Sequence, residues 1–143
     1  MYTHILVPLE HSSADAAILT HAQDLARLAG SRMTVVHVAD GWAARNYDAL
    51  ALRESEEMKS DREYVEQVVA DIRSNGIRAD GLLARGDPAS EILRVADQER
   101  VDLIAMATHG HRFLADVIKG ATADRVRHLA RCPVLMVRHD TSR

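Results

Sequence analysis

Short apolar segments alternate with longer helical patterns along the whole chain, and this alternation constrains the fold more than any other feature. Most of the apolar segments are nearly continuous in Val, Ile and Leu, which is typical of strands covered on both faces, as in a parallel sheet. The weakest pattern is the third. The expected strands are His4 to Leu9, Met33 to Val38, Ile77 to Leu83, Val101 to Ala107 and Pro133 to Val137.

Capping residues mark the ends of the expected helices. Ser13 or Asp15 is expected to cap the first helix, and Gly30 is positioned to end it. Asp87 is followed by Pro88, the usual order of an N-cap and a first helical residue. The sequence therefore predicts helices between successive strands.

The order β-α-β-α-β-α-β-α-β predicts a doubly wound five-stranded parallel sheet with helices on both faces, a Rossmann-like α/β fold. We expect a single domain over residues 1–143, because this length is typical of one domain with its own core. Ligands of such sheets bind beyond the carboxyl ends of the strands, where the strand order reverses. A site is therefore expected at that edge.

Composition narrows the classes of partner. The formal net charge of −3 provides no positive field that would hold nucleic acid or an anionic membrane. The single cysteine, Cys132, excludes an internal disulfide and is expected to be a small buried hydrophobe. No apolar stretch approaches the roughly 20 residues of a membrane span, and no signal-peptide pattern opens the chain. We expect a soluble, cytoplasmic protein with no nucleic-acid or membrane partner.

Two glycines, Gly110 and Gly120, follow the fourth expected strand, and Gly120 is expected to open the last helix. Free N–H groups at a helix start bind anions, and glycine lets a phosphate approach the backbone. Alternatively, Gly110 supplies a turn with positive φ and Gly120 merely begins a helix. Spacing alone leaves both interpretations open.

Histidines near these glycines are candidates for anion contact rather than for metal binding. His109 and His111 have no Cys, Asp or Glu at matching short spacing, and a structural metal usually needs about four protein ligands. Contact with phosphate, by their rings or by Arg112, is the preferred interpretation. His37, inside the second strand, is expected to be a histidine whose hydrogen bonds are satisfied within the fold.

Over nearly its full length the chain resembles the universal stress protein (UspA) family, whose fold is adenine nucleotide alpha hydrolase-like. The resemblance runs from HILVPLEHSS through MTVVHV and GDPASEIL to ATHGHRFLADVIKGATADRVRHLARCPVLMV. ATP-binding members carry Gly, two residues, Gly, nine residues, Gly, then Ser or Thr. The matching positions here are Ala107, Gly110, Gly120 and Ala121. The spacing is kept, but Ala107 adds a methyl and Ala121 lacks a hydroxyl, although Thr122 follows at once.

The resemblance implies an adenosine pocket at the ends of the first two strands. Pro8 and Leu9 would line the base, and Val38 would pack against it. Glu10, where the family commonly has Asp, would accept hydrogen bonds from ribose hydroxyls. The expected nucleotide-binding residues are Pro8, Leu9, Glu10, Val38, Met106, Ala107, Thr108, His109, Gly110, His111, Arg112, Gly120, Ala121 and Thr122.

The function implied by the resemblance is binding of ATP, AMP or a related adenine nucleotide as a regulatory ligand in stress response, with Mg²⁺ as a candidate companion ion. The resemblance also implies a homodimer through the last strand, Pro133 to Val137, and an unidentified protein partner. No Ser-His-Asp order, paired carboxylates or phosphate-loop Lys is visible, so at most slow ATP hydrolysis is expected and no catalytic or metal-binding residue is predicted.

Four other classes of protein are alternatives to a nucleotide-binding stress protein. A stress protein that has lost nucleotide binding and acts through dimer and protein contacts is favoured by the alanines at 107 and 121. A phosphoryl-accepting receiver domain needs an Asp after the third strand and a Lys after the fifth, whereas Asp87 is a helix cap and Arg138 follows the fifth strand. An electron-transfer flavoprotein subunit needs a second subunit. A nucleotidyl-transfer enzyme usually has a glycine- and serine-rich loop where this chain reads VPLEHSS.

Overall fold

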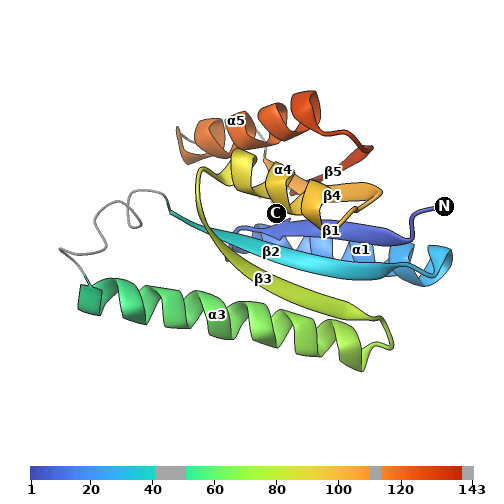
Figure 1. Ribbon diagram of the computed structural model, residues 1–143, viewed down its shortest axis with the longest axis horizontal. Coiled ribbons are helices and arrows are strands. Elements are labelled where there is room, and N and C mark those ends of the chain that lie inside the picture. Colours follow the sequence, from blue (N-terminus) through green and yellow to red (C-terminus); the bar gives the residue numbers. More distant parts are fainter. Residues whose placement is uncertain (41–50, 110–113, 140–143) are drawn as a thin grey trace.

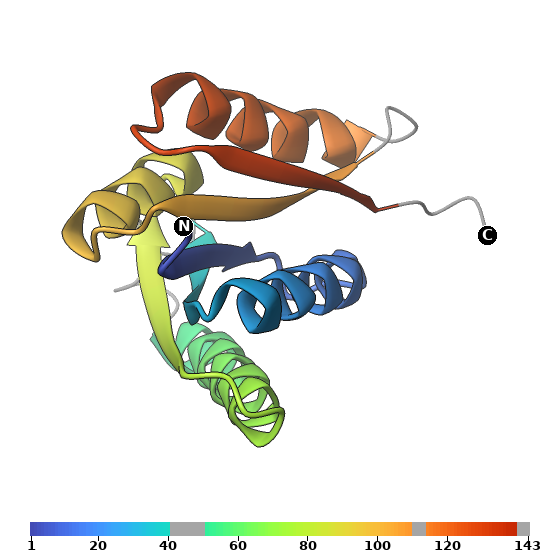
Figure 2. The same ribbon diagram turned by 90° about the vertical axis from the view of Figure 1, so that its right-hand side faces the viewer.

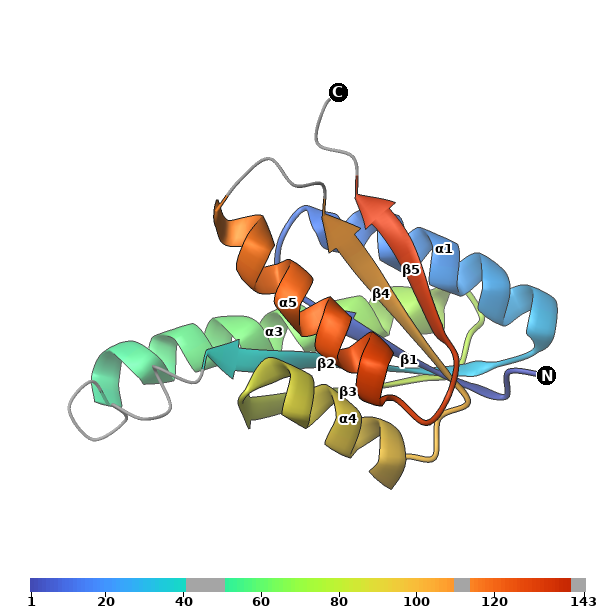
Figure 3. The same cartoon turned by 90° about the horizontal axis from the view of Figure 1, so that it is seen from above.

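The computed structural model describes the backbone of residues 1–40, 51–109 and 114–139, and the side chains of residues 1–39, 56–108 and 120–139. Five strands form one sheet in the order β3-β2-β1-β4-β5, and each pairs in parallel with its neighbours. Figure 3 shows β4 and β5 side by side and pointing the same way. The strands are β1 (His4–Leu9), β2 (Arg32–Asp40), β3 (Ala79–Gly86), β4 (Leu103–His109) and β5 (Val134–His139). The helices are α1 (Ala14–Ala29), α3 (Ala51–Ser74), α4 (Pro88–Gln98) and α5 (Leu114–Leu129).

The predicted doubly wound parallel sheet is confirmed. Strand β1 lies between β2 and β4, so the chain order reverses on either side of it, which is where a ligand is expected in such sheets. Helices α1 and α3 cover one face and α4 and α5 cover the other (Figures 1 and 2). Within the part of the chain that the structure describes, no helix is long and apolar enough to cross a membrane.

Each face of the sheet carries its own apolar core. Alternate residues of β1 point to opposite sides, so Ile5 and Val7 join the core under α1 and α3, whereas Leu6 joins the core under α4 and α5. All six residues of β1 are buried. Burial on both faces explains why the strand reads as an uninterrupted apolar run.

The predicted helix ends at Gly30 and Asp87 are confirmed. Gly30 adopts φ of 72°, a left-handed conformation that glycine enters without a Cβ penalty. The carboxylate of Asp87 accepts a hydrogen bond from the backbone N–H of Ser90 at 3.0 Å. Ser13 occupies the N-cap position of α1 but makes no side-chain cap hydrogen bond. Asp15 instead bonds to backbone groups that precede the helix, as described below.

The prediction that Gly120 opens the last helix is wrong. Helix α5 begins at Leu114, so Gly120 lies in its interior. A glycine in a helix costs about 1 kcal/mol relative to alanine, but helix formation is cooperative, and the burial of Ala123 and Val126 against the sheet stabilises α5 as a whole. Among the described residues, no heavy atom outside its own stretch of helix lies within 4 Å of the place a Cβ would occupy. Gly120 is therefore not required by packing.

A buried histidine lies at the opposite end of the sheet from the expected site. His4 Nδ1 donates to the carbonyl of Glu99 at 3.2 Å, so Nε2 accepts a hydrogen bond from the Thr34 hydroxyl at 2.7 Å. Burial and the nearby charge of Arg32 lower the pKa of His4, outweighing the hydrogen bond to Glu99. The neutral ring is thus the form that fits the fold.

The pH dependence of stability should reflect this neutral histidine. Because the folded-state pKa of His4 lies below its ordinary 6.5, the unfolded chain binds the proton first, and stability falls as pH drops below about 6.5. His4→Gln should cost roughly 1–3 kcal/mol at pH 7.5, since buried polar partners are left unsatisfied. In urea unfolding, the free-energy difference between the wild type and His4→Gln should be smaller at pH 5.5 than at pH 7.5. A difference that stays constant or widens would contradict the assignment.

Candidate functional site

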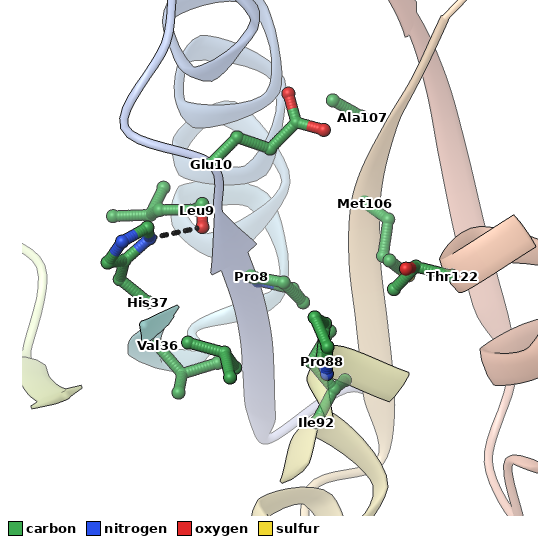
Figure 4. A pocket seen from close by; sticks show the side chains of 11 residues that line it. Pro8, Leu9, Glu10, Val36, His37, Pro88, Ile92, Met106, Ala107 and Thr122 are labelled. Atoms are coloured by element: carbon green, nitrogen blue, oxygen red, sulfur yellow. Dashed lines mark hydrogen bonds between the residues drawn. The ribbon is translucent and has the colours of Figure 1, made fainter. Parts of the chain in front are cut away.

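An apolar pocket lies at the carboxyl ends of β1, β2 and β4, where the first residues of α4 and the second half of α5 approach the sheet. Its cavity measures about 200 Å³. Pockets that enclose a drug-sized ligand are about 300–1,000 Å³, so this cavity is sized for one flat group of a larger molecule. Its lining residues are Pro8, Leu9, Glu10, Val36, His37, Val38, Pro88, Ile92, Met106, Ala107 and Thr122 (Figure 4).

The pocket gathers half of the residues that the sequence predicted. These come from three strands and a helix that are distant in the chain, and they are Pro8, Leu9, Glu10, Val38, Met106, Ala107 and Thr122. Thr108 of β4 and Gly120 and Ala121 of α5 lie outside the lining, and the side chain of His109, the last residue of β4, falls outside the described part of the chain. Gly110, His111 and Arg112 fall outside the described residues.

Four lining residues were missed as pocket residues by sequence reasoning: Val36, His37, Pro88 and Ile92. Pro88 and Ile92 had been assigned only a role in the helix after Asp87. Because α4 starts at the same sheet edge, its first turn necessarily faces the pocket. The motif GDPASEIL carried that signal, since Asp87 places the helix start at the carboxyl end of β3.

Asp15 organises the turn between β1 and α1. Its buried carboxylate accepts hydrogen bonds from the backbone N–H groups of Glu10 and His11, each at 2.9 Å. The φ of His11 is 60°, a region that residues other than glycine rarely occupy. The hydrogen bonds to Asp15 hold this conformation and thereby fix the direction in which the chain leaves β1.

Tyr64 ties helix α3 to the same turn. Its hydroxyl donates to Asp15 Oδ2 at 2.5 Å, and its ring stacks on that of His11 with centroids 4.0 Å apart. Burial and the hydrogen bond to Asp15 raise the pKa of Tyr64, so the hydroxyl remains a donor across the physiological range. The wall of the site formed by residues 10 to 12 is therefore braced from two helices.

Polar groups also lie around the mouth of the pocket. The Glu10 side chain extends from the end of β1 toward Ala107 (Figure 4), and its carboxylate accepts a hydrogen bond from the Ser12 hydroxyl at 3.1 Å. Asp87, at the start of α4, forms an ion pair with Arg125 of α5 at 2.8 Å. Hydrogen bonds from Ser90, together with the charge of Arg125, lower the pKa of Asp87. Glu10 lines the pocket, and Asp87 directly precedes the lining residue Pro88.

The predicted role of His37 as a satisfied histidine is confirmed, but the residue does more than satisfy its own hydrogen bonds. Its Nδ1 donates to the Leu9 carbonyl at 3.0 Å, a bond between the ends of β2 and β1 (Figure 4). His37 is among the residues that line the pocket, but its ring extends to the α3 side of the sheet, where Nε2 lies 3.4 Å from Asp61 Oδ1. His37 thus contacts two different environments at one sheet edge.

Comparison with known proteins gives consistent results. A family model described as the universal stress protein family matches residues 1–138. A universal stress protein of Thermus aquaticus, from the 3′ region of the QAH/OAS sulfhydrylase gene, is 34% identical over 131 residues, covering 90% of this chain and 91% of its own. Universal stress protein MJ0577 of Methanocaldococcus jannaschii is 25% identical over 162 residues, covering 99% and 98%. A solved MJ0577 structure matches this fold with a TM-score of 0.87 at 24% identity over 99% of each chain.

A solved structure that carries a nucleotide is also similar. The universal stress protein from Archaeoglobus fulgidus in complex with dAMP is 27% identical, with a TM-score of 0.70, and the match covers 94% of this chain and 97% of that one. Relatives with this fold thus include a protein with a bound adenine nucleotide.

Replacing Asp15 should test how much the turn depends on one carboxylate. Asp15→Asn keeps the shape but turns an NH₂ group toward N–H and O–H donors, and hydrogen bonds to charged groups contribute about 1.5–3 kcal/mol. We expect a loss of that size in urea unfolding. Asp24→Asn, on the exposed face of α1 and paired only with Arg27 among the described residues, should change stability by less than about 0.5 kcal/mol. Equal losses for the two variants would contradict this role.

Proposed function

The chain belongs to the universal stress protein family, and from this premise we propose that it binds ATP or a related adenine nucleotide at the carboxyl edge of its sheet as a regulatory ligand. The observation that carries the proposal is the convergence of Pro8, Val38, Met106, Ala107 and Thr122 on one apolar pocket at the strand-order reversal. The bound dAMP of the Archaeoglobus fulgidus relative supports the same class of ligand.

The pocket suits the flat part of such a ligand. Its lining is mostly apolar, with Pro8, Val38 and Met106 contributed by three adjacent strands. A purine base buried there would remove its apolar ring faces from water and gain contact on both of them. Glu10, at the rim, is placed to accept hydrogen bonds from ribose hydroxyls. The phosphates would then lie outside the cavity, toward α5.

The two departures from the family motif have different consequences. Ala107 is part of the lining, so its methyl group reduces the space available to a nucleotide. Ala121 is exposed and outside the lining, whereas the next residue, Thr122, contributes to it. Thr122 therefore presents a hydroxyl to the pocket although the motif position itself has none. The proposal assigns Thr122 to the phosphate or ribose end of the ligand, with Mg²⁺ as a companion of the phosphates.

Regulation would follow from population shift. A nucleotide in this pocket contacts β1, β2, β4, α4 and α5 at once, so it stabilises whichever arrangement of these elements closes on it. A protein partner that recognises this arrangement would then bind according to whether the nucleotide is present. The substitutions at 107 and 121 favour one other function, that of a stress protein which acts through protein contacts without a nucleotide.

The proposed assembly is a homodimer through β5. This strand is at an edge of the sheet, and its apolar residues Val134, Leu135, Met136 and Val137 are all only half-buried. An exposed apolar edge strand invites pairing with another chain. A second copy would cover it.

Substitutions at Ala107 should move nucleotide affinity in opposite directions. Ala107→Val fills the pocket and should weaken ATP binding at least about tenfold, whereas Ala107→Gly removes the methyl and should strengthen it. The measurement is calorimetric titration of nucleotide-stripped protein with Mg-ATP and AMP, supported by thermal unfolding. A ligand at 100 times its Kd adds about 2.7 kcal/mol of stability.

Ala70→Val, on the exposed face of α3, is the matched control and should bind ATP like the wild type. Identical affinities for Ala107→Val, Ala107→Gly and the wild type would place the ligand elsewhere. A wild type that binds neither ATP nor AMP at millimolar concentration would favour the function without a nucleotide.

A charge on β5 should separate the proposed dimer. Met136→Lys places a charge on this edge, whereas Leu82→Lys places one on β3, the opposite edge, with both parent side chains packed against the same core. Sedimentation velocity should show a dimeric wild type and Leu82→Lys variant and a monomeric Met136→Lys variant. A wild type that is monomeric at all micromolar concentrations, or dissociation by Leu82→Lys alone, would refute the β5 interface.

A further inference from the structure

Two imidazoles and one carboxylate meet beside the pocket, on the side of the sheet covered by α3. They belong to His11 after β1, His37 in β2 and Asp61 in α3. His11 Nδ1 lies 2.8 Å from Asp61 Oδ1, and His37 Nε2 lies 3.4 Å from the same oxygen. The three ligand atoms are all within 4.8 Å of one another. Two ring nitrogens therefore converge on a single carboxylate oxygen.

The hydrogen bond of His37 to Leu9 determines what its other nitrogen offers. A carbonyl oxygen can only accept, so the Nδ1 atom of His37 carries a hydrogen. In the neutral ring, Nε2 then presents a lone pair toward Asp61 Oδ1. Two electron-rich atoms facing each other are compatible only when a proton or a metal cation lies between them. A backbone carbonyl that fixes the tautomer is the usual outer partner of a metal-binding histidine.

We propose that His11, His37 and Asp61 bind one divalent transition-metal ion of the zinc class. Zinc takes nitrogen and oxygen ligands at about 2.0–2.2 Å in tetrahedral geometry, which separates neighbouring ligand atoms by about 3.3 Å. The 3.4 Å between His37 and Asp61 already matches this separation, and the 2.8 Å between His11 and Asp61 needs to open by about half an ångström.

The donor set favours a transition metal over magnesium or calcium. Imidazole nitrogen suits zinc, copper, iron and nickel, whereas magnesium and calcium take oxygen ligands. Among the described residues, the ion-pair partners of Asp61 are the two histidines, so the cluster with neutral rings carries one negative charge. Three protein ligands leave a fourth position for water or an added ligand, as in zinc sites that stay open.

The ligands are held in place by groups outside the cluster. His11 stacks on Tyr64, whose hydroxyl donates to Asp15, and Asp15 in turn accepts the backbone N–H of His11. Asp61 precedes Tyr64 and Val65 by about one helical turn, and the burial of Val65 presents that face of α3 to the sheet. Because these contacts already restrict the ligand side chains, little conformational entropy is lost when an ion binds, which favours affinity.

The test uses the full chain without an affinity tag, first freed of metal with a chelator and kept free of nucleotide. Calorimetric titration with Zn²⁺ at pH 7.5, and visible absorption with Co²⁺, should show one ion per chain and the intense bands of a four-coordinate cobalt site. Asp61→Asn keeps the size of the side chain, and His11→Asn suits the positive φ, so both should fold. Each should weaken binding at least about a hundredfold.

Two controls locate the ion. His21→Asn, on the exposed face of α1, and the double variant His109→Gln/His111→Gln should both bind like the wild type. Loss of binding in either control, or wild-type affinity in both Asp61→Asn and His11→Asn, would overturn the assignment, as would a wild type with no one-to-one binding. The last result would leave the contacts of His11 and His37 with Asp61 as structural ones. Because nucleotide is absent throughout, these outcomes are independent of ATP binding.

Discussion

Complete coverage of β1 is the constraint on which the rest of this structure depends. Both of its faces are buried under helices and both of its edges pair with other strands, so only its carboxyl end, at Pro8 and Leu9, borders the pocket. The candidate functional residues therefore lie at its carboxyl end, where the chain turns. The neighbouring strands β2 and β4 end at the same edge. The pocket and the His11, His37 and Asp61 cluster both arise at that point.

The turn after β1 is built by polar bonds rather than by apolar packing. A buried carboxylate is stable only when its oxygens are fully used, and Asp15 meets this requirement with two short backbone hydrogen bonds and the Tyr64 hydroxyl. The same bonds hold His11 in a left-handed conformation and anchor α3 to the sheet edge. The hydrogen bonds that hold the turn after β1 thus also position α3 and its side chains at this edge of the sheet.

Sequence reasoning was most successful where burial alone decides the structure. The apolar runs located every strand, the third from the weakest pattern. Strands β2 to β5 all extend beyond their predicted ends, because Arg85 and Thr108 remain in register with Ala39 and Arg138 through backbone pairing. Backbone hydrogen bonds do not require an apolar side chain. The prediction that Gly120 begins a helix failed for a different reason. Glycine is a poor helix former, but cooperative helix formation continues α5 through this position. The contact between His11 and Asp61 spans 50 residues and depends on the packing of α3, which no local pattern encodes.

The position of His37 has a thermodynamic consequence. The residue borders the apolar pocket, while its ring extends toward α3, where Nε2 faces Asp61 and Nδ1 donates to the Leu9 carbonyl. A shift of β2 at His37 that accommodates a ligand in the pocket would also move the ring relative to Asp61. Two ligands that share such a residue are linked, and the factor by which the first alters the affinity of the second equals the factor in the reverse direction. A single imidazole between two strand ends would therefore make this edge of the sheet a reciprocal coupling point.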